Sequence, residues 1–125
     1  MSRLIVRPEF YSIARMKGGE PVGLSSRARF ASISRLGDET TIVCPAADAP
    51  AGSEVCDGLR LIEVDGDFAL DSIGGVAGVA GPLAMAGVSL FAFSVWNTDA
   101  FLVQAADLER AKTALLAAGH TLAEP

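Results

Sequence analysis

The chain has 125 residues, of which half are apolar and one fifth are charged, and its formal net charge is −5. This length fits one domain, or two very small units that share a core, and the apolar content is enough to fill that core. A disordered chain combines low hydrophobicity with high charge, so the composition excludes disorder.

The charges are distributed unevenly along the sequence. Residues 1–35 carry seven basic and two acidic side chains, and the remainder carries three basic and thirteen acidic ones. A basic segment can be the electrostatic footprint of a nucleic-acid-binding protein. No interleaved aromatic residues, zinc finger or RNP-like motif accompany it, so we expect no nucleic-acid partner. The other interpretations are attraction between the two halves of one body, and solvated charges.

Cysteine usage and the apolar segments indicate the compartment. Cys44 and Cys56 are twelve positions apart with no CxxC motif, and the first residues include no apolar run of signal-peptide length. We therefore expect reduced thiols in a cytoplasmic protein, with neither a disulfide framework nor a zinc site. Residues 72–98 carry no charge and are long enough to span a bilayer. Their glycines, Pro82 and a β-rich end favour a helix followed by a buried strand, so we predict no membrane segment.

The first half of the chain predicts strands with few helical residues. A short strand is expected over residues 11–16, with a turn at residues 17–21, where two glycines and a proline occur together. Residues 30–35 and 40–44 are β-prone and flank a Gly-Asp turn, which predicts a β-hairpin. Residues 45–58 are rich in Ala, Pro and Asp and predict a loop that can include one turn of helix.

The second half predicts a complete βαββαβ unit, the order of the ferredoxin-like α+β fold. The expected elements are a strand at 59–64, a helix from 71 to 87, strands at 88–96 and 100–104, a helix capped by Asp107 and ended by Gly119, and a strand at 120–122. Asp71 or Ser72 can cap the first helix, and Pro82 is expected to kink or interrupt it. The apolar stripe expected on that helix consists of Ile73, Val76, Ala77, Ala80, Leu83 and Ala84. The first half repeats the strand plan with reduced helices, so we predict a tandem whose first unit is degenerate.

Residue types suited to catalysis are sparse. His120 is the only histidine and has no Ser or Cys motif near it in sequence, and no HExxH, GxSxG or P-loop lysine occurs. Asp65 and Asp67 flank a glycine, which is typical of a turn rather than of a paired acid–base site. We predict no catalytic residue, no metal site and no cofactor, and we do not expect an enzyme.

The glycines of the first predicted helix are more informative. They are spaced GGxxGxxG from Gly74 to Gly81 with no following lysine, which does not fit a phosphate-binding loop. Small residues allow a helix to pack closely against a neighbour. The backbone N–H groups at residues 72–75 would also point out of the helix N-terminus, whose partial positive charge suits a carboxylate. Close packing and a ligand site are compatible here.

Asp99 ends the uncharged segment, between Trp96 and Phe101. The ordinary interpretation of Asp99 is a solvated carboxylate in a hairpin turn. The functional hypothesis is that it faces the ammonium or guanidinium group of a ligand. Together with a carboxylate site at the helix start, it would recognise both charged poles of an α-amino acid.

Several segments carry a specific combined pattern, and in this combination the chain resembles the small bacterial ACT-like proteins related to the CASTOR arginine sensors. The segments are residues 11–13, 30–35, 38–39 and 42–45 in the first half and residues 73–77, 82–91, 94–99 and 101–103 in the second. The resemblance implies a tandem of two ACT-like units, residues 1–58 and 59–125. It also implies a homodimer that holds its ligand where residues 71–74 meet a symmetry mate. Trp96 departs from the family, in which Tyr or Phe is common.

The leading hypothesis is therefore a regulatory ACT-like protein that binds a small molecule, most naturally an amino acid, at a homodimer interface. Asp99 falls where the family's side-chain-reading aspartate would lie. The predicted ligand-binding residues are Asp71, Ser72, Ile73, Gly74, Gly75, Thr98 and Asp99. The alternatives are a structural or protein-interaction module with a vestigial pocket and, third, an unrecognised enzyme.

Overall fold

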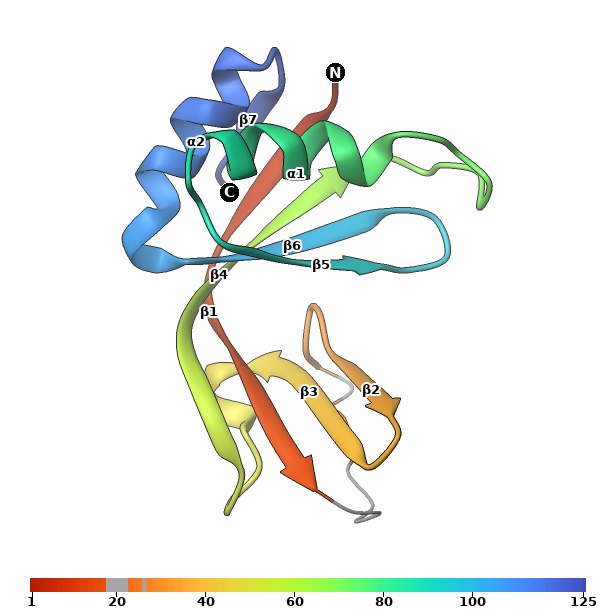
Figure 1. Ribbon diagram of the computed structural model, residues 1–125, viewed down its shortest axis with the longest axis vertical. Coiled ribbons are helices and arrows are strands. Elements are labelled where there is room, and N and C mark those ends of the chain that lie inside the picture. Colours follow the sequence, from red (N-terminus) through yellow and green to blue (C-terminus); the bar gives the residue numbers. More distant parts are fainter. Residues whose placement is uncertain (18–22, 26) are drawn as a thin grey trace. The chain divides into compact units, whose positions relative to one another are not determined.

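The computed structural model describes residues 1–17, 23–25 and 27–125, and within them the chain forms two compact units (Figure 1). The first unit comprises Met1–Pro8 and Arg60–Pro125, and the second comprises Glu9–Leu59. Two long strands, β1 (Arg3–Lys17) and β4 (Glu54–Asp65), each contribute residues to both units.

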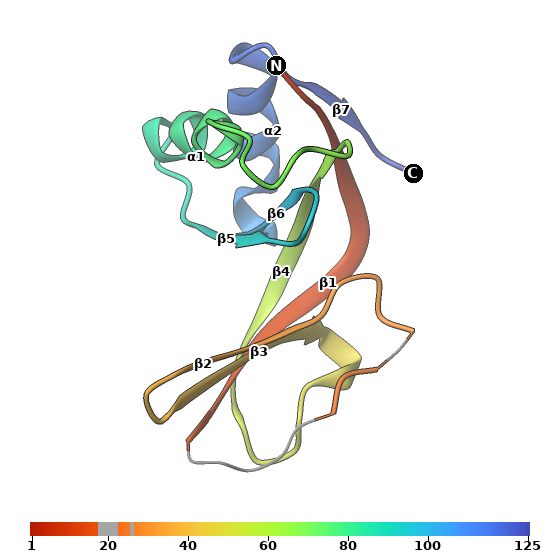
Figure 2. The ribbon, with the colours of Figure 1, turned by 90° about the vertical axis from the view of Figure 1, so that its right-hand side faces the viewer.

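The first unit has the predicted βαββαβ order, and the α+β, ferredoxin-like fold class is confirmed. The elements after β4 are α1 (Gly75–Met85), β5 (Leu90–Ser94), β6 (Asp99–Gln104), η2 (Ala105–Asp107), α2 (Leu108–Ala117) and β7 (Thr121–Ala123). The strands are ordered β7-β1-β4-β6-β5. β1 therefore lies between β7 and β4, and Figure 2 shows β7 beside it. The pairing of β1 with β7 is parallel, from Arg3 opposite Thr121 to Ile5 opposite Ala123.

The start of β1 differs from the sequence prediction. The strand begins at Arg3, eight positions before the predicted residue 11, and it passes through Pro8. Proline cannot donate a ladder hydrogen bond and is unusual inside a strand, so local sequence does not predict one continuous strand through Pro8. The consequence is that the N-terminal segment completes the sheet of the first unit.

Both helices cover one face of this sheet and share its core. The buried residues come from alternate positions of the strands and from helical positions three or four apart, as expected when each element buries one face. They are Leu4, Val6, Ile62, Val64, Val79, Leu83, Val88, Phe101, Val103, Leu108, Ala111 and Leu115. Each large side chain among them contributes about 1.5–3 kcal/mol through burial.

The first helix begins later than predicted. Its N-cap is Gly74, with a φ of 86°, and not Asp71 or Ser72. Ile73, which the sequence placed on the apolar stripe, precedes the helix and is 99% exposed. The buried residues of the helix are Leu83, which the predicted stripe included, and Val79, which it did not. The helix is not interrupted at Pro82 but continues to Met85.

The second helix agrees better with its prediction. Asp107 occupies the N-cap position, although its carboxylate accepts a hydrogen bond from Arg110 at 2.8 Å and caps no backbone amide. Gly119 ends the helix with a φ of 96°, and the amides of Gly119 and His120 donate to the carbonyls of Leu116 and Leu115. A left-handed glycine is the usual residue at this position.

The second unit is built from β1, β2 (Ser32–Leu36), β3 (Glu39–Pro45) and the first half of β4. The predicted hairpin is present, with β2 antiparallel to β3. β3 also pairs with β1, and this pairing is antiparallel too. A short turn, η1 (Ala46–Asp48), precedes β4, which begins five residues earlier than predicted. The turn predicted over residues 17–21 lies mostly outside the described residues.

Ion pairs account for part of the uneven charge distribution. Arg3 pairs with Asp65, Arg7 with Glu63 and Arg15 with Glu39. Basic residues of the first third therefore meet carboxylates from later in the chain, as one of the earlier interpretations anticipated. Among the described residues, no helix is both long and apolar enough to cross a membrane.

Candidate ligand-binding site

A cavity of about 610 Å³ lies at the N-terminal end of α1, entirely within the first unit. Small-molecule sites usually enclose about 300–1,000 Å³. Its walls come from the N-terminus, the end of β4, the loop and first turn of α1, and the turn between β5 and β6. The lining residues are Met1, Ser2, Val64, Phe68, Ala69, Leu70, Ser72–Ala77 and Ser94–Asp99.

Two of these walls are hydrogen-bonded to each other. The amide of Phe68 in the loop before α1 donates to the carbonyl of Asn97 at 2.8 Å. The hydroxyl of Thr98 donates to the carbonyl of Val64 at 2.7 Å. The amide of Val95 donates to Thr98 across the hairpin turn. These bonds join the hairpin turn to the end of β4 and to the loop before α1, which also line the cavity.

The helix end that faces the cavity is not capped by a side chain. Gly74 has no side chain to accept from the first turn, and the first intrahelical bond runs from Gly78 to the carbonyl of Gly74, at 3.0 Å. The amides of the first turn therefore point out of the helix end, which carries partial positive charge. Such an end suits a carboxylate.

Asp99 lies against this helix end. A β-carbon added to Gly75 would stand 3.0 Å from Oδ2 of Asp99, so the glycine makes room for the carboxylate. Oδ1 accepts a hydrogen bond from the hydroxyl of Ser94 at 2.6 Å. Asp99 is the only charged side chain among the described residues that line the cavity. A cationic group entering here would meet a carboxylate and no basic side chain.

Large apolar side chains surround the mouth of the cavity. Ile73 is 99% exposed, Trp96 79% and Leu70 68%, and Phe68, Val76 and Val95 are also exposed. Soluble monomers rarely expose so many clustered apolar groups, and such patches mark binding surfaces. The mouth therefore offers apolar area as well as the polar groups below it.

Most of the predicted site residues meet in this cavity. Ser72, Ile73, Gly74, Gly75, Thr98 and Asp99 line it, whereas Asp71 does not and is exposed. The sequence had assigned Asp71 as a possible helix cap, but Asp71 lies within a turn closed by the Ser72 amide and the Ala69 carbonyl, and α1 begins only at Gly75.

Sequence reasoning missed the apolar part of the site. Phe68, Leu70, Val76, Val95 and Trp96 line the cavity and were not among the predicted residues. For all of them except Val76, which lies in α1 and on the predicted apolar stripe, the signal that could have found them is the occurrence of large apolar residues in a loop and a turn, where no core-forming periodicity requires them.

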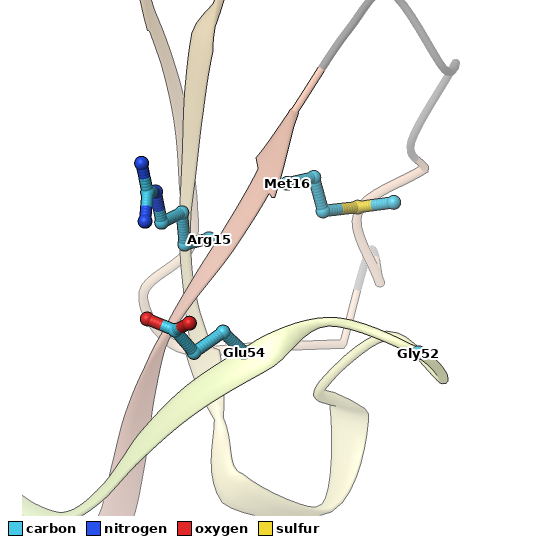
Figure 3. A pocket seen from close by; sticks show the side chains of 4 residues that line it. All are labelled: Arg15, Met16, Gly52 and Glu54. Carbon is cyan, nitrogen blue, oxygen red and sulfur yellow. The ribbon is translucent and has the colours of Figure 1, made fainter.

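The second unit contains a smaller hollow of about 300 Å³, lined by Arg15, Met16, Gly52 and Glu54 (Figure 3). Nε of Arg15 donates to Glu39 at 2.8 Å, and this hydrogen bond raises the pKa of Arg15. The guanidinium is thus already engaged. The described part of the chain holds no group of three or more His, Cys, Asp or Glu side chains that could bind a metal ion.

Comparison with known proteins defines the class of this chain. The sequence profile of the ACT domain family matches residues 54–117. A protein from Agobacterium tumefaciens with a known crystal structure is 33% identical, over 99% of this chain and 93% of that one, with a TM-score of 0.89. The chain therefore belongs to the ACT domain family. No curated protein matches the sequence.

More distant structures share the fold. The ligand-free regulatory subunit of aspartate kinase from Thermus thermophilus has a TM-score of 0.68 at 11% identity, over 93% of this chain and 96% of the subunit. Aspartate kinase from Synechocystis has a TM-score of 0.68 at 16% identity, over 99% of this chain but 28% of the enzyme. At these identities the likeness extends to the fold alone.

Proposed function

We propose that this protein is a non-catalytic regulatory module that binds an amino acid in the cavity at the N-terminal end of α1. The observation that carries the proposal is the pairing of opposite charges in one cavity. The uncapped first turn of α1 offers partial positive charge, and the Asp99 carboxylate lies beside it. An α-amino acid presents a carboxylate and an ammonium group two bonds apart, so both groups can be bound at adjacent points.

The remaining part of the ligand would be recognised by the apolar mouth. Trp96 and Ile73 extend outward from the polar groups, and neither is covered by the described residues of this chain. We propose that a second copy covers them, so that the ligand is held at a homodimer interface. A ligand that fits only the assembled state would shift the equilibrium by its differential affinity for the two states.

The proposal also covers the relatives of this protein, its compartment and its division into units. The protein is taken to be a relative of the CASTOR sensors, to work in the cytoplasm, and to contain a degenerate ACT-like unit in residues 1–58 before the complete one in residues 59–125. The hairpin β2–β3 packed beside β1 supports the degenerate unit. Membership of the ACT domain family supports a regulatory role without catalysis.

A second function, docking of a partner protein with the cavity unused, is favoured by the same exposed apolar mouth. The two are separated by a thermal-shift screen of the twenty amino acids. A ligand at one hundred times its Kd stabilises the folded state by about 2.7 kcal/mol, a shift of several degrees. Absence of a shift with every amino acid would favour docking.

Two variants test the assignment of the binding residues. Asp99→Asn should abolish the shift if Asp99 binds the ammonium group, because the amide keeps the shape and loses the charge. Asp71→Asn is the matched control, since Asp71 is exposed and does not line the cavity. Equal loss of the shift in both variants would place the ligand elsewhere.

A further inference from the structure

Pro82 leaves a helix carbonyl without its usual donor. In an α-helix the N–H of residue 82 would donate to the carbonyl of residue 78, but proline has no N–H. Pro82 lies inside α1, which continues to Met85. The carbonyl of Gly78 therefore needs a partner from outside the helix.

His120 supplies that partner. Its Nε2 lies 2.7 Å from the carbonyl oxygen of Gly78. Its Nδ1 accepts a hydrogen bond from the backbone amide of Ser2 at 3.1 Å. Because Nδ1 is an acceptor, the proton of the neutral ring is on Nε2, which donates to Gly78. His120 is buried, with 6% of its surface exposed, and both hydrogen bonds are partly buried.

The ring connects two walls of the cavity to the end of α2. The amide of His120 donates to the Leu115 carbonyl of α2, and the next amide, of Thr121, donates to the carbonyl of Ser2. Met1 and Ser2 form one wall of the cavity. The first turn of α1, directly before Gly78, forms another.

We propose that His120 is a positioning residue of the cavity. Its ring replaces the N–H that Pro82 lacks and sets the distance between the N-terminal wall and α1. The consequence for the ligand rests on the proposed function, whereas the pairing of His120 with Pro82 does not. This role also accounts for the burial of the only histidine of the chain directly after α2.

A double-mutant cycle tests the pairing without any ligand. His120→Phe keeps a ring and removes both hydrogen bonds, and Pro82→Ala supplies an amide that can donate to Gly78. The effect of His120→Phe on the unfolding equilibrium constant should be about fivefold smaller in the Pro82→Ala background. Additive effects of the two substitutions would overturn the proposal.

Amide hydrogen exchange separates the positioning role from simple packing. In His120→Asn the side-chain carbonyl oxygen can accept in the place of Nδ1, and in His120→Gln the side-chain N–H group can donate in the place of Nε2. The Ser2 amide should thus stay protected in His120→Asn and lose protection in His120→Gln. Equal loss in both variants would indicate that the ring only fills space, and would contradict the proposal.

L-Arginine is the probe for the effect on binding. If the wild-type protein binds it, His120→Phe should weaken the affinity at least about fivefold, because two walls of the cavity lose their fixed spacing. Unchanged affinity would remove the positioning role. If wild-type protein binds none of the amino acids, the proposed function fails, and the cycle with Pro82 still decides this inference.

Discussion

Replacing Gly74 with alanine is expected to destabilise the first unit, and the same replacement at Gly78 is expected to stabilise it. Gly74 has a φ of 86°, and an added β-carbon would meet nothing within 4 Å, so its cost comes from the backbone alone. A left-handed conformation costs an L-residue about 1–2 kcal/mol. Gly78 lies inside α1, and its β-carbon would make an ordinary contact, 4.0 Å from the His120 ring. Alanine there should gain about 0.8–1 kcal/mol of helix propensity.

Urea unfolding followed by circular dichroism measures both effects, because α1 and α2 both belong to the first unit. With a slope of about 2 kcal/mol per molar urea, the midpoint should fall by about 0.5–1 M in Gly74→Ala and rise by about 0.5 M in Gly78→Ala. A midpoint that does not fall in Gly74→Ala would refute the assignment of Gly74 as a left-handed N-cap, and one that does not rise in Gly78→Ala would refute the uncrowded position of Gly78 inside α1.

Three further predictions concern other parts of the chain. Leu83→Ala should cost about 2–5 kcal/mol in urea unfolding, since Leu83 is fully buried against the sheet, and a loss below 1 kcal/mol would contradict that position. Glu63→Gln should lower the free energy of unfolding by about 1–3 kcal/mol, because Glu63 accepts two hydrogen bonds from the largely buried Arg7. Asp65 pairs with Arg3 at an exposed position, so Asp65→Asn should change that free energy by less than about 1 kcal/mol. A maleimide should label the exposed Cys56 quickly and Cys44 slowly, because burial raises the pKa of the Cys44 thiol and lowers its thiolate population; equal rates would contradict this.

Much of the first unit could be predicted from local signals. The spacing of Leu108, Ala111 and Leu115 predicts the buried face of α2, and Gly119 predicts its end. The strands predicted at residues 88–96 and 100–104 do pair as the antiparallel hairpin β5–β6, but β5 is largely exposed and not buried as the uncharged segment had suggested. These features depend on residues close together in sequence, so periodicity and turn chemistry are sufficient to find them.

The features that the sequence did not reveal depend on distant partners. The strand at Arg3 is stabilised by pairing with residues 121–123, more than one hundred positions away. The bond from His120 to Gly78 compensates for Pro82 from a distant part of the chain, whereas local propensity alone predicted that Pro82 would kink or interrupt α1. Asp71 and Ser72 are good capping residues by type, but the loop turns before the helix begins at Gly75.

The site also combines features that the sequence predicts with features that it does not. The hypothesis that a helix start and Asp99 act together came from residue types, and Oδ2 of Asp99 does lie next to Gly75. The apolar mouth around Leu70 and Trp96 was not assigned, because its one sequence signal, large apolar residues in a loop and a turn, does not show that they line a common cavity.

An NMR titration of the uniformly ¹⁵N-labelled protein with an amino acid selected by the thermal-shift screen tests the binding site most directly. The proposal predicts saturable shifts of the amides at residues 73–77 and 94–99, which line the cavity, and little change in residues 9–59. Saturable shifts confined to residues 9–59, with the cavity amides unmoved, would contradict the assignment of the ligand to the helix end beside Asp99.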